Sequence, residues 1–390
     1  MAATDKALLP AGLTDGLAPN AAHEAAIRER LVAAFEASGF DRVSPPLVEF
    51  EDHLLAGTGA AMSAQTFRLM DPISQRMMGL RADITPQAAR IAASRLAHLP
   101  RPLRLCYTGE VLRVRGSQLR PERQFTQAGA ELIGAPGADA DAEMVLTAVD
   151  ALTAVGVADI KVDLCQPTLV PLVIKGLKID DADAGRFRLA LDRKDAAEVE
   201  ALSQELGTDA RGILKSLLLA SGPVESVADK IAALPLSGAA AEARDALLQT
   251  ATLIAEAAPE IDITLDAVEN RGFEYHTGVT FTMFAIGVRG ELGTGGRYQA
   301  VTGNGNGDEA GEPATGFTLF LDSILRAVPA PETAPRLFLP AETSREQAWI
   351  LQGQGYRTVR GLGNVTDAKA EAKRLGCTHV WIDGTAVTIE

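Results

Sequence analysis

The stretch Arg104–Gly134, RLCYTGEVLRVRGSQLRPERQFTQAGAELIG, decides the fold. Residues 103–114 at its beginning and 123–133 at its end are both rich in apolar and β-branched or aromatic side chains, so each is predicted to be a strand. Gly116 and Pro121 lie between them and indicate a loop of roughly nine residues. The stretch therefore predicts an antiparallel hairpin with a long loop.

One face of this hairpin would carry an unusual set of side chains, because side chains alternate across a strand. The set is Phe125, Gln127, Gly129 and Glu131 on one strand and Tyr107, Gly109, Val111 and Arg113 on the other. A face that packs on a core is apolar, whereas this one offers an amide, a carboxylate, a guanidinium and a phenol above two glycines. It predicts the lining of a site for a small polar ligand. The alternative is the solvated face of an edge hairpin.

The composition is ordinary for a soluble globular protein, with 390 residues, 47% hydrophobic and 23% charged. No run approaches about 18 apolar residues, and the N-terminus lacks a cationic start before an apolar block, so we expect a cytoplasmic protein without membrane contact. The net charge of −14 does not favour nucleic acid, because phosphates attract basic surfaces. The widely spaced Cys106, Cys165 and Cys377 predict structural burial. We expect no metal and no other cofactor.

Upstream of the hairpin, residues 25–38 predict a helix, since Ile27, Leu31 and Phe35 form a stripe that ends at Gly39. Thr85 and Pro86 predict a helix start with the threonine hydroxyl as N-cap, and the helix should run to about residue 97. Short strands are expected at 41–44, 67–70 and 77–80.

Downstream, residues 168 to about 258 predict a helical insertion, because they are rich in Ala, Leu, Glu and Asp. The other expected elements are helices at 140–155 and 315–328, strands at 160–164, 263–268, 279–286 and 289–293, and a loop at 303–313. A proline-rich linker at 328–336 precedes a small α/β unit. Its elements are a strand (337–339), a helix (345–354), a strand (358–360), a helix (368–375), a strand (379–383) and a terminal strand. These patterns predict an α+β protein with an antiparallel sheet flanked by helices.

Three other segments are too polar for their strand setting: LRADIT at 80–85, NRGFEYHTGVTF at 270–281 and ELGTGGRY at 291–298. Together with the hairpin, they resemble the active centre of class II aminoacyl-tRNA synthetases. The hairpin is similar to motif 2 of that family, and RGFEYHTG and GTGGRY resemble the two signature peptides of histidyl-tRNA synthetases. LPAGLTDGLAP at 9–19 resembles their N-terminal peptide.

The resemblance covers about residues 9–328 and implies a class II synthetase-like domain over 1–328, with residues 329–390 as a truncated anticodon-domain-like unit. Residues 25–46 are similar to motif 1, which implies a homodimer.

The sequence differs from that of an active synthetase at the positions that bind ATP. The family binds ATP with arginines of motifs 2 and 3, and the adenine lies between an aromatic ring and the motif 3 arginine. Arg113 and Phe125 match the arginine and the aromatic ring that motif 2 contributes to ATP binding. Ser323, however, stands at the motif 3 arginine position, and Arg115 replaces the usual motif 2 glutamate. The lost phosphate contact costs about 1.5–3 kcal/mol and the lost stacking about 1 kcal/mol more. Arg326, one turn on, is not expected to substitute, so adenylation is not expected.

The C-terminal unit is shorter than the family's anticodon-binding domain and is not basic, so no tRNA binding is expected. Arg-Ala-Asp-x-Thr at 81–85 resembles the pattern of the regulatory subunits of ATP phosphoribosyltransferase. That resemblance implies a non-catalytic protein that pairs with the short catalytic subunit in the first step of histidine biosynthesis, which joins ATP and phosphoribosyl pyrophosphate. It also implies activation of that partner and feedback inhibition by histidine.

The resemblance assigns a histidine site to nine residues. The α-ammonium falls to Asp83, Thr85 and Gln127, the carboxylate to Arg113 or Arg271, and the imidazole to Glu131, Tyr275 and Tyr298. His276 stands where the synthetases usually carry a second tyrosine, and its alternative is a satisfied strand histidine.

Arg81 and Arg297 are either cations of the pocket or structural partners, and the structural role is favoured. Whether histidine occupies this pocket or a subunit interface stays open. The alternative functions are an active histidyl-tRNA synthetase or another amino-acid-activating ligase.

Overall fold

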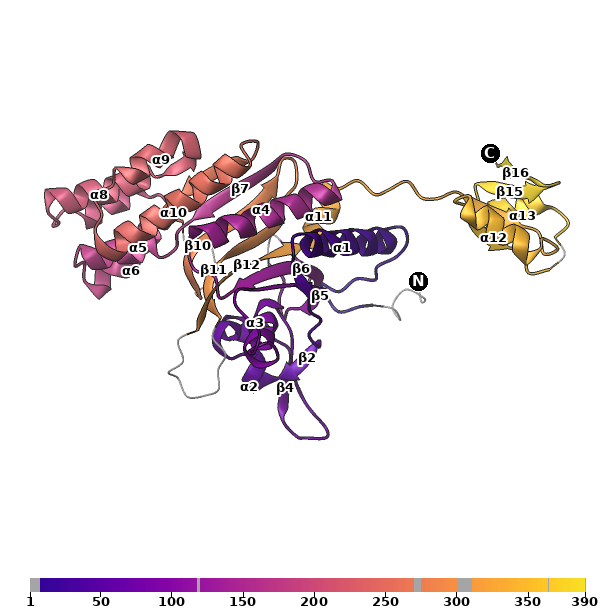
Figure 1. Cartoon of the computed structure of the whole chain (residues 1–390), viewed down its shortest axis with the longest axis horizontal. Helices are drawn as coiled ribbons and strands as arrows, with labels where there is room; N and C mark the ends of the chain where they lie inside the picture. Colours follow the sequence, from indigo (N-terminus) through magenta and orange to yellow (C-terminus); the bar gives the residue numbers. More distant parts are fainter. Residues whose placement is uncertain (1–7, 118–119, 270–274, 301–310, 364, 390) are drawn as a thin grey trace. The chain divides into compact units, whose positions relative to one another are not determined.

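The computed structural model describes residues 8–117, 120–269, 275–300, 311–363 and 365–389. They divide into two compact units, Met1–Pro329 and Ala330–Glu390. A nine-stranded sheet organises the larger unit (Figure 1). From edge to edge its strands are β1 (Asp41–Arg42), β5 (Leu103–Leu112), β6 (Gln124–Ile133), β12 (Glu312–Phe320), β11 (Gly293–Ala300), β10 (His276–Ala285), β7 (Ile160–Cys165), β9 (Asp262–Asp266) and β8 (Ser221–Pro223).

The sheet is mostly antiparallel, with parallel pairs only at β1–β5 and β7–β9 among the strands described. The predicted hairpin is β5–β6, in which Tyr107 lies opposite Gly129 and Gly109 lies opposite Gln127. Cross-strand partners point to the same side, so the predicted polar set forms one face of the sheet. The predicted α+β class, with a sheet flanked by helices, is confirmed, although the sheet is mixed rather than purely antiparallel.

One face of the sheet carries the main core and is covered by α1 (Asn20–Ala37), α4 (Ala138–Val155) and α10 (Gly238–Ala257) (Figure 1). The predicted stripe of α1 is buried here, and the Phe35 ring meets Phe317 edge-on at 5.5 Å between centroids. Gly39 has a φ of +84°, which explains the end of α1 at a glycine. Small residues of β6, Ala128 and Ala130, let α1 and α4 approach closely.

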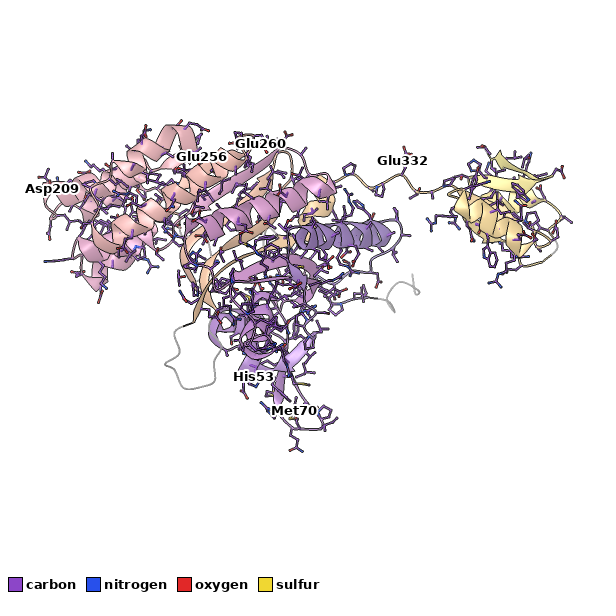
Figure 2. The ribbon with its side chains drawn as sticks, in the orientation of Figure 1. His53, Met70, Asp209, Glu256, Glu260 and Glu332 are labelled. Atoms are coloured by element: carbon purple, nitrogen blue, oxygen red, sulfur yellow. The ribbon has the colours of Figure 1, made fainter. Side chains whose placement is uncertain are left out.

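The opposite face carries α3 (Thr85–Ser94) and a small sheet of order β2 (Val48–Phe50), β4 (Met77–Leu80) and β3 (Arg68–Met70), with α2 (Glu51–Leu54) and the 3-10 helix η2 (Gly57–Gln65). Ile84 and Ala88 of the α3 region pack on Tyr107, Val111 and Phe125 of the hairpin. The β3–β4 hairpin projects from this side, with Met70 63% exposed near its end (Figure 2). The main core therefore leaves this face of the large sheet free to carry a cavity.

The helical insertion is present and contains one short strand, β8, which pairs with β9. Its other elements before α10 are α5 (Leu169–Gly176), α6 (Asp181–Asp192), α7 (Ala196–Leu202), α8 (Thr208–Leu218) and α9 (Val224–Ala232). Aspartates cap two of these helices, since Asp180 accepts from the Asp183 amide and Asp195 from the Glu198 amide. Asp209, Glu256 and Glu260 point outward from α8, α10 and the turn after α10 (Figure 2), in keeping with the acidic balance of the chain.

The C-terminal unit has a four-stranded sheet of order β14 (Arg357–Arg360), β13 (Arg336–Leu339), β15 (His379–Ile382) and β16 (Thr385–Thr388), with α12 (Arg345–Gly353) and α13 (Ala368–Arg374). Every element falls where the sequence predicts it. Two small clusters fill its interior, one around Phe338 and Val380 and one around Leu337 and Leu351. Its relation to an anticodon-binding domain remains a prediction.

Three predicted elements differ most from the structure in type or extent, while smaller differences include the strand predicted at 41–44, which is only Asp41–Arg42, and the helix from Thr85, which ends at Ser94. Residues 289–292 are not a strand, because β11 begins at Gly293, and residues 315–320 belong to β12, with only α11 (Leu321–Ala327) helical. The segment TGFTLF has β-branched and aromatic residues and lies between β11 and β6, so sheet pairing prevails over its helical pattern. Of the predicted loop at 303–313, residues 303–310 lie outside the described part, and Glu312 and Pro313 belong to β12.

The predicted N-cap at Thr85 is also wrong. Ile84 occupies the capping position without a side-chain hydrogen bond, and the Thr85 hydroxyl instead lies 3.0 Å from the Tyr107 hydroxyl. Across the described residues, no helix has the length and apolar character needed to span a bilayer.

Candidate functional site

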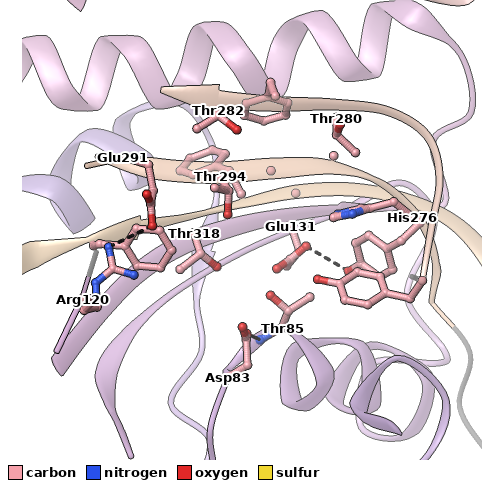
Figure 3. A pocket seen from close by; sticks show the side chains of 18 of the residues that line it. Asp83, Thr85, Arg120, Glu131, His276, Thr280, Thr282, Glu291, Thr294 and Thr318 are labelled. Atoms are coloured by element: carbon pink, nitrogen blue, oxygen red, sulfur yellow. Dashed lines mark hydrogen bonds and ion pairs between the residues drawn. The ribbon is translucent and has the colours of Figure 1, made fainter. Parts of the chain in front are cut away.

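A cavity of about 620 Å³ lies on the face of the sheet opposite the main core, between the sheet and the start of α3. Figure 3 shows its two ends: Asp83, Thr85, Glu131 and His276 lie toward one, and Arg120 and Glu291 toward the other. A row of threonines, Thr282, Thr294 and Thr318, lies in register across β10, β11 and β12 between them. Further lining residues include Arg113, Ser117, Tyr275, Thr280, Tyr298, Gly316 and Phe320.

Glu131 stands at the centre of the first end. It is 1% exposed, and its two carboxylate oxygens accept hydrogen bonds from the hydroxyls of Tyr107 and Tyr298, each at 2.9 Å. Gly316 lies opposite it on β12, and a Cβ at that position would stand 1.8 Å from a Glu131 oxygen. The glycine is therefore required for the carboxylate to lie where it does.

Burial raises the pKa of the Glu131 carboxyl from its ordinary 4.5 to about 8, although the tyrosine hydrogen bonds lower it. Burial also raises the pKa of both tyrosines well above 10, and the neighbouring Glu131 adds to this. The tyrosines remain neutral donors at physiological pH. The carboxyl is poised to exchange a proton with a basic ligand group in the neutral range.

Asp83 and Arg113 place one negative and one positive charge side by side at the edge of this end. A guanidinium nitrogen of Arg113 is 3.9 Å from an Asp83 oxygen, which gives attraction without a hydrogen bond. Asp83 accepts from the Thr85 amide at 2.9 Å, and Arg113 donates to the Ala82 carbonyl at 3.2 Å. Two opposite charges at this spacing match the ammonium and carboxylate that a free amino acid carries on one carbon.

Aromatic walls complete this end. The rings of Tyr275 and Tyr298 meet edge-on at 6.0 Å between centroids, and the Tyr275 ring lies 4.6 Å from the His276 ring. His276 is opposite Tyr298 in the β10–β11 pairing. A flat, polar ring would here meet aromatic faces together with the Glu131 carboxyl.

Seven of the nine predicted site residues line this one cavity: Asp83, Thr85, Arg113, Glu131, Tyr275, His276 and Tyr298. Gln127 does not line it; its side chain is fully buried, and its oxygen accepts from the Ile84 amide at 3.2 Å, where it supports the turn that carries Asp83. Arg271 lies outside the described residues.

The two arginines expected to be structural have structural contacts. Arg297 pairs with the buried Asp141, and Arg81 donates to the carbonyls of Glu110 and Pro45. A Cβ at Gly109 would stand 2.2 Å from the Arg81 guanidinium. The Arg81 side chain thus fills the space above Gly109, and that space is not available to a ligand.

The other end of the cavity contains Arg120, which the sequence analysis did not single out. Arg120, from the β5–β6 loop, bonds Asp322 through Nε at 3.1 Å and lies 3.5 Å from Glu291. Its guanidinium carbon is 3.7 Å from the centroid of the Phe320 ring. Ser323, at the position of the motif 3 arginine, accepts from Arg326 at 2.9 Å. No local sequence pattern predicts the burial of Arg120, because its guanidinium bonds Asp322, some 200 positions away in the sequence.

The predicted burial of all three cysteines is confirmed. Within the described part of the chain, no cluster of three or more His, Cys, Asp or Glu side chains could hold a metal ion. The charged, hydroxyl and aromatic groups that line the cavity suit a polar organic molecule.

Residues 12–324 match the family model described as histidyl-tRNA synthetase. An ATP phosphoribosyltransferase regulatory subunit from Paramagnetospirillum magneticum is 52% identical over 375 residues, which cover 96% of both chains. This chain belongs to the family of ATP phosphoribosyltransferase regulatory subunits. Members of that family take part in histidine biosynthesis and have a histidyl-tRNA-synthetase-like fold.

Solved structures show the same fold. One is an ATP phosphoribosyltransferase regulatory subunit/histidyl-tRNA synthetase from Bacillus halodurans, with a TM-score of 0.80 at 24% identity over 94% of this chain and 96% of that one. Another is the ATP phosphoribosyl transferase (HisG:HisZ) complex from Thermotoga maritima, with a TM-score of 0.58 at 17% identity over 76% of this chain and 97% of that one. This regulatory-subunit chain therefore has the class II synthetase-like fold that its sequence predicts.

Proposed function

We propose that this chain is a non-catalytic subunit that binds a separate ATP phosphoribosyltransferase catalytic chain, activates it, and inhibits it when histidine occupies the cavity. The family supplies the regulatory role, and the Thermotoga maritima complex is a precedent for a catalytic partner. The observation that carries the histidine proposal is Glu131, a buried carboxyl with two tyrosine donors and a pKa of about 8 beside a zwitterion-sized pair of charges.

Histidine would fit by its chemistry. Its ammonium would lie against Asp83 and the Thr85 hydroxyl, and its carboxylate against Arg113. Its imidazole would then reach the Glu131 carboxyl between Tyr275 and Tyr298. Arg271 is a further candidate for the carboxylate, and Gln127 would act through the Asp83–Thr85 turn rather than by contact.

The other end of the cavity supports the proposed absence of aminoacylation. A synthetase needs cations there for the triphosphate, but Ser323 replaces the motif 3 arginine, and Glu291 and Asp322 place two carboxylates beside Arg120. Carboxylates repel a triphosphate, so ATP activation is disfavoured. The acidic chain likewise offers no general attraction for tRNA.

Co-expression with the host's short catalytic chain tests the proposal. The phosphoribosyltransferase rate is measured with and without this subunit and across a range of histidine concentrations. We expect activation by the subunit and inhibition by histidine. In Glu131→Ala, the histidine concentration for half-inhibition should rise at least about tenfold, as for a lost hydrogen bond to a charged group.

Glu110→Gln is the matched control, because Glu110 is an exposed carboxylate on the neighbouring strand β5. It should leave histidine inhibition as in the unchanged subunit. Pyrophosphate exchange dependent on histidine and ATP by the subunit alone would contradict the proposal and support a histidyl-tRNA synthetase or another amino-acid-activating ligase.

A further inference from the structure

The end of the cavity away from Glu131 is filled by a side chain of the protein itself. Arg120 is 7% exposed, and its guanidinium carbon lies 3.7 Å from the Phe320 ring centroid and 5.0 Å from that of Phe125. The two rings meet edge-on at 6.1 Å and form an aromatic corner. The separation from Phe320 is a stacking distance, so a flat group occupies this corner.

The polar groups around the corner face the flat group: Asp322 and Ser323 accept hydrogen bonds from it, and Glu291 forms an ion pair with it. Nε of Arg120 is 3.2 and 3.1 Å from the two Asp322 oxygens, Nη2 is 3.4 Å from the Ser323 hydroxyl, and Nη2 is 3.5 Å from a Glu291 oxygen. An aromatic corner with two carboxylates and a hydroxyl suits a planar group that carries several N–H donors.

Two hydrogen bonds join Arg120 to Ser117 in the β5–β6 loop. The Arg120 amide donates to the Ser117 hydroxyl at 2.9 Å, and the Ser117 amide donates to the Arg120 carbonyl at 2.7 Å. Arg326 lies within 3.5 Å of the same Asp322 carboxylate and donates to Ser323, but its side chain is 43% exposed and it does not line the cavity. The partners of Arg120 therefore have a second cation. Among the described residues, Arg120 alone lies over the Phe320 ring, whereas the Phe125 ring also has the Arg113 guanidinium 5.0 Å from its centroid.

We propose that Arg120 is a specificity-determining residue that excludes adenine-type bases from the cavity by occupying their place with its own guanidinium. An aminopurine is flat, stacks on aromatic rings and carries an exocyclic amine that a carboxylate accepts. The corner offers a partner for each of these contacts, and Arg120 already occupies every one of those partners. The cavity thus admits a small zwitterion at the Glu131 end and rejects a nucleoside at the other. This inference does not depend on which amino acid the first end binds.

Calorimetric measurement of adenosine binding to the full chain tests this assignment. Adenosine is preferable to ATP, because Glu291 and Asp322 would repel phosphates once Arg120 is removed. Arg120→Ala should bind adenosine at least about tenfold more tightly than the unchanged protein, since stacking on an aromatic ring supports such a gain. Methylguanidine should displace adenosine competitively, because it restores the missing group.

Arg326→Ala is the matched control: it removes a guanidinium from the same carboxylate and hydroxyl without uncovering the rings, and it should gain no adenosine binding. Thermal unfolding shows whether each variant is folded. If Arg120→Ala does not fold, Arg120→Lys is measured, because it keeps a cation for the carboxylates but leaves the Phe320 ring uncovered; it should show a smaller gain. A folded variant that binds adenosine no better than the unchanged protein overturns the proposal, as does adenosine binding that methylguanidine leaves intact.

Discussion

Glu131 sets the expected pH dependence of histidine binding. Its carboxyl has a pKa of about 8, and a free imidazole has one of about 6.5. If carboxyl and imidazole share one proton in the complex, binding releases a proton below about pH 6.5 and takes one up above about pH 8. Affinity should therefore be highest between these values and fall by up to about tenfold per pH unit on either side.

Calorimetry in buffers of different ionisation enthalpy measures this proton exchange, and its sign should reverse across the window. Glu131→Gln cannot ionise, so the loss of affinity above pH 8 that belongs to Glu131 should vanish, while the loss on the acid side remains. A variant that keeps the full alkaline loss would show that another group, such as the ligand's own ammonium, causes it.

Gly316 provides the space that Glu131 occupies. A methyl group there would clash with the carboxylate at 1.8 Å, so Gly316→Ala forces the side chain to move or the strands to shift. We expect a loss of about 1–3 kcal/mol in the free energy of unfolding, together with loss of most histidine affinity. Urea unfolding and calorimetry measure the two effects.

Gly212→Ala is the control for the glycine-to-alanine change itself. Gly212 lies inside α8, and a Cβ at that position meets nothing within 4 Å. Alanine favours a helix interior over glycine, so this variant should gain about 0.5–1 kcal/mol and bind histidine unchanged. Equal destabilisation of both variants would sink the argument for a specific clash.

At the scale of elements, a buried ion pair joins strand β11 to helix α4. Arg297 contacts Asp141 at 2.9 and 3.0 Å and also donates to the carbonyls of Ala135 and Gly137. Asp141 is 2% exposed, and burial raises its pKa against the opposing effect of Arg297. Arg297→Ala leaves that carboxylate buried without its cation, and we expect a loss of about 3 kcal/mol in stability at pH 7.

The loss should be smaller near pH 5, because the Asp141 pKa rises further without Arg297 and the neutral acid is cheaper to bury. Denaturant unfolding at the two pH values measures this. Arg374→Ala, which breaks an exposed pair with Glu371, should change stability at neither pH. A pH-independent loss in Arg297→Ala would indicate that lost packing, rather than the buried charge, is responsible.

The sequence predicts those elements whose pattern is local. The stripe of α1 with its terminal glycine, the β5–β6 hairpin and every element of the C-terminal unit carry their periodicity within a few residues. β12 fails this test, because its pattern suits a helix until β6 and β11 are placed on either side of it. Local turn rules likewise assign Thr85 as an N-cap, whereas Tyr107 takes its hydroxyl in the fold.

The same division applies to the cavity. The sequence predicts that Glu131 and Tyr298 lie in the cavity, because the resemblance names both residues and strand alternation places their side chains on the cavity face of the sheet. Gln127 obeys the same alternation, yet its amide lies behind the Asp83 turn, where only packing decides its contact. Arg120 and its partner Asp322 lie far apart in sequence, and no pattern in either segment relates them.

At the scale of the whole molecule, the described residues that line the cavity all fall between Asp83 and Phe320, within the unit Met1–Pro329. The segment 329–335 has no regular secondary structure, and the second unit has its own clusters around Phe338 and Leu351. Limited proteolysis should therefore cut first in 329–335, because an extended exposed segment fits a protease. The large fragment should keep its histidine affinity within about twofold, since no lining residue is lost.

Mass spectrometry locates the cut, and calorimetry on the purified fragment measures the affinity. The released unit is small enough that its own fold is marginal, so its unfolding after cleavage would not count against the prediction. Mixing the fragment with the catalytic chain then tests histidine binding and association with the catalytic chain separately. A fragment that binds histidine but no longer associates with the catalytic chain would assign partner contact to Ala330–Glu390, whereas loss of histidine affinity on cleavage would contradict a site contained in the larger unit.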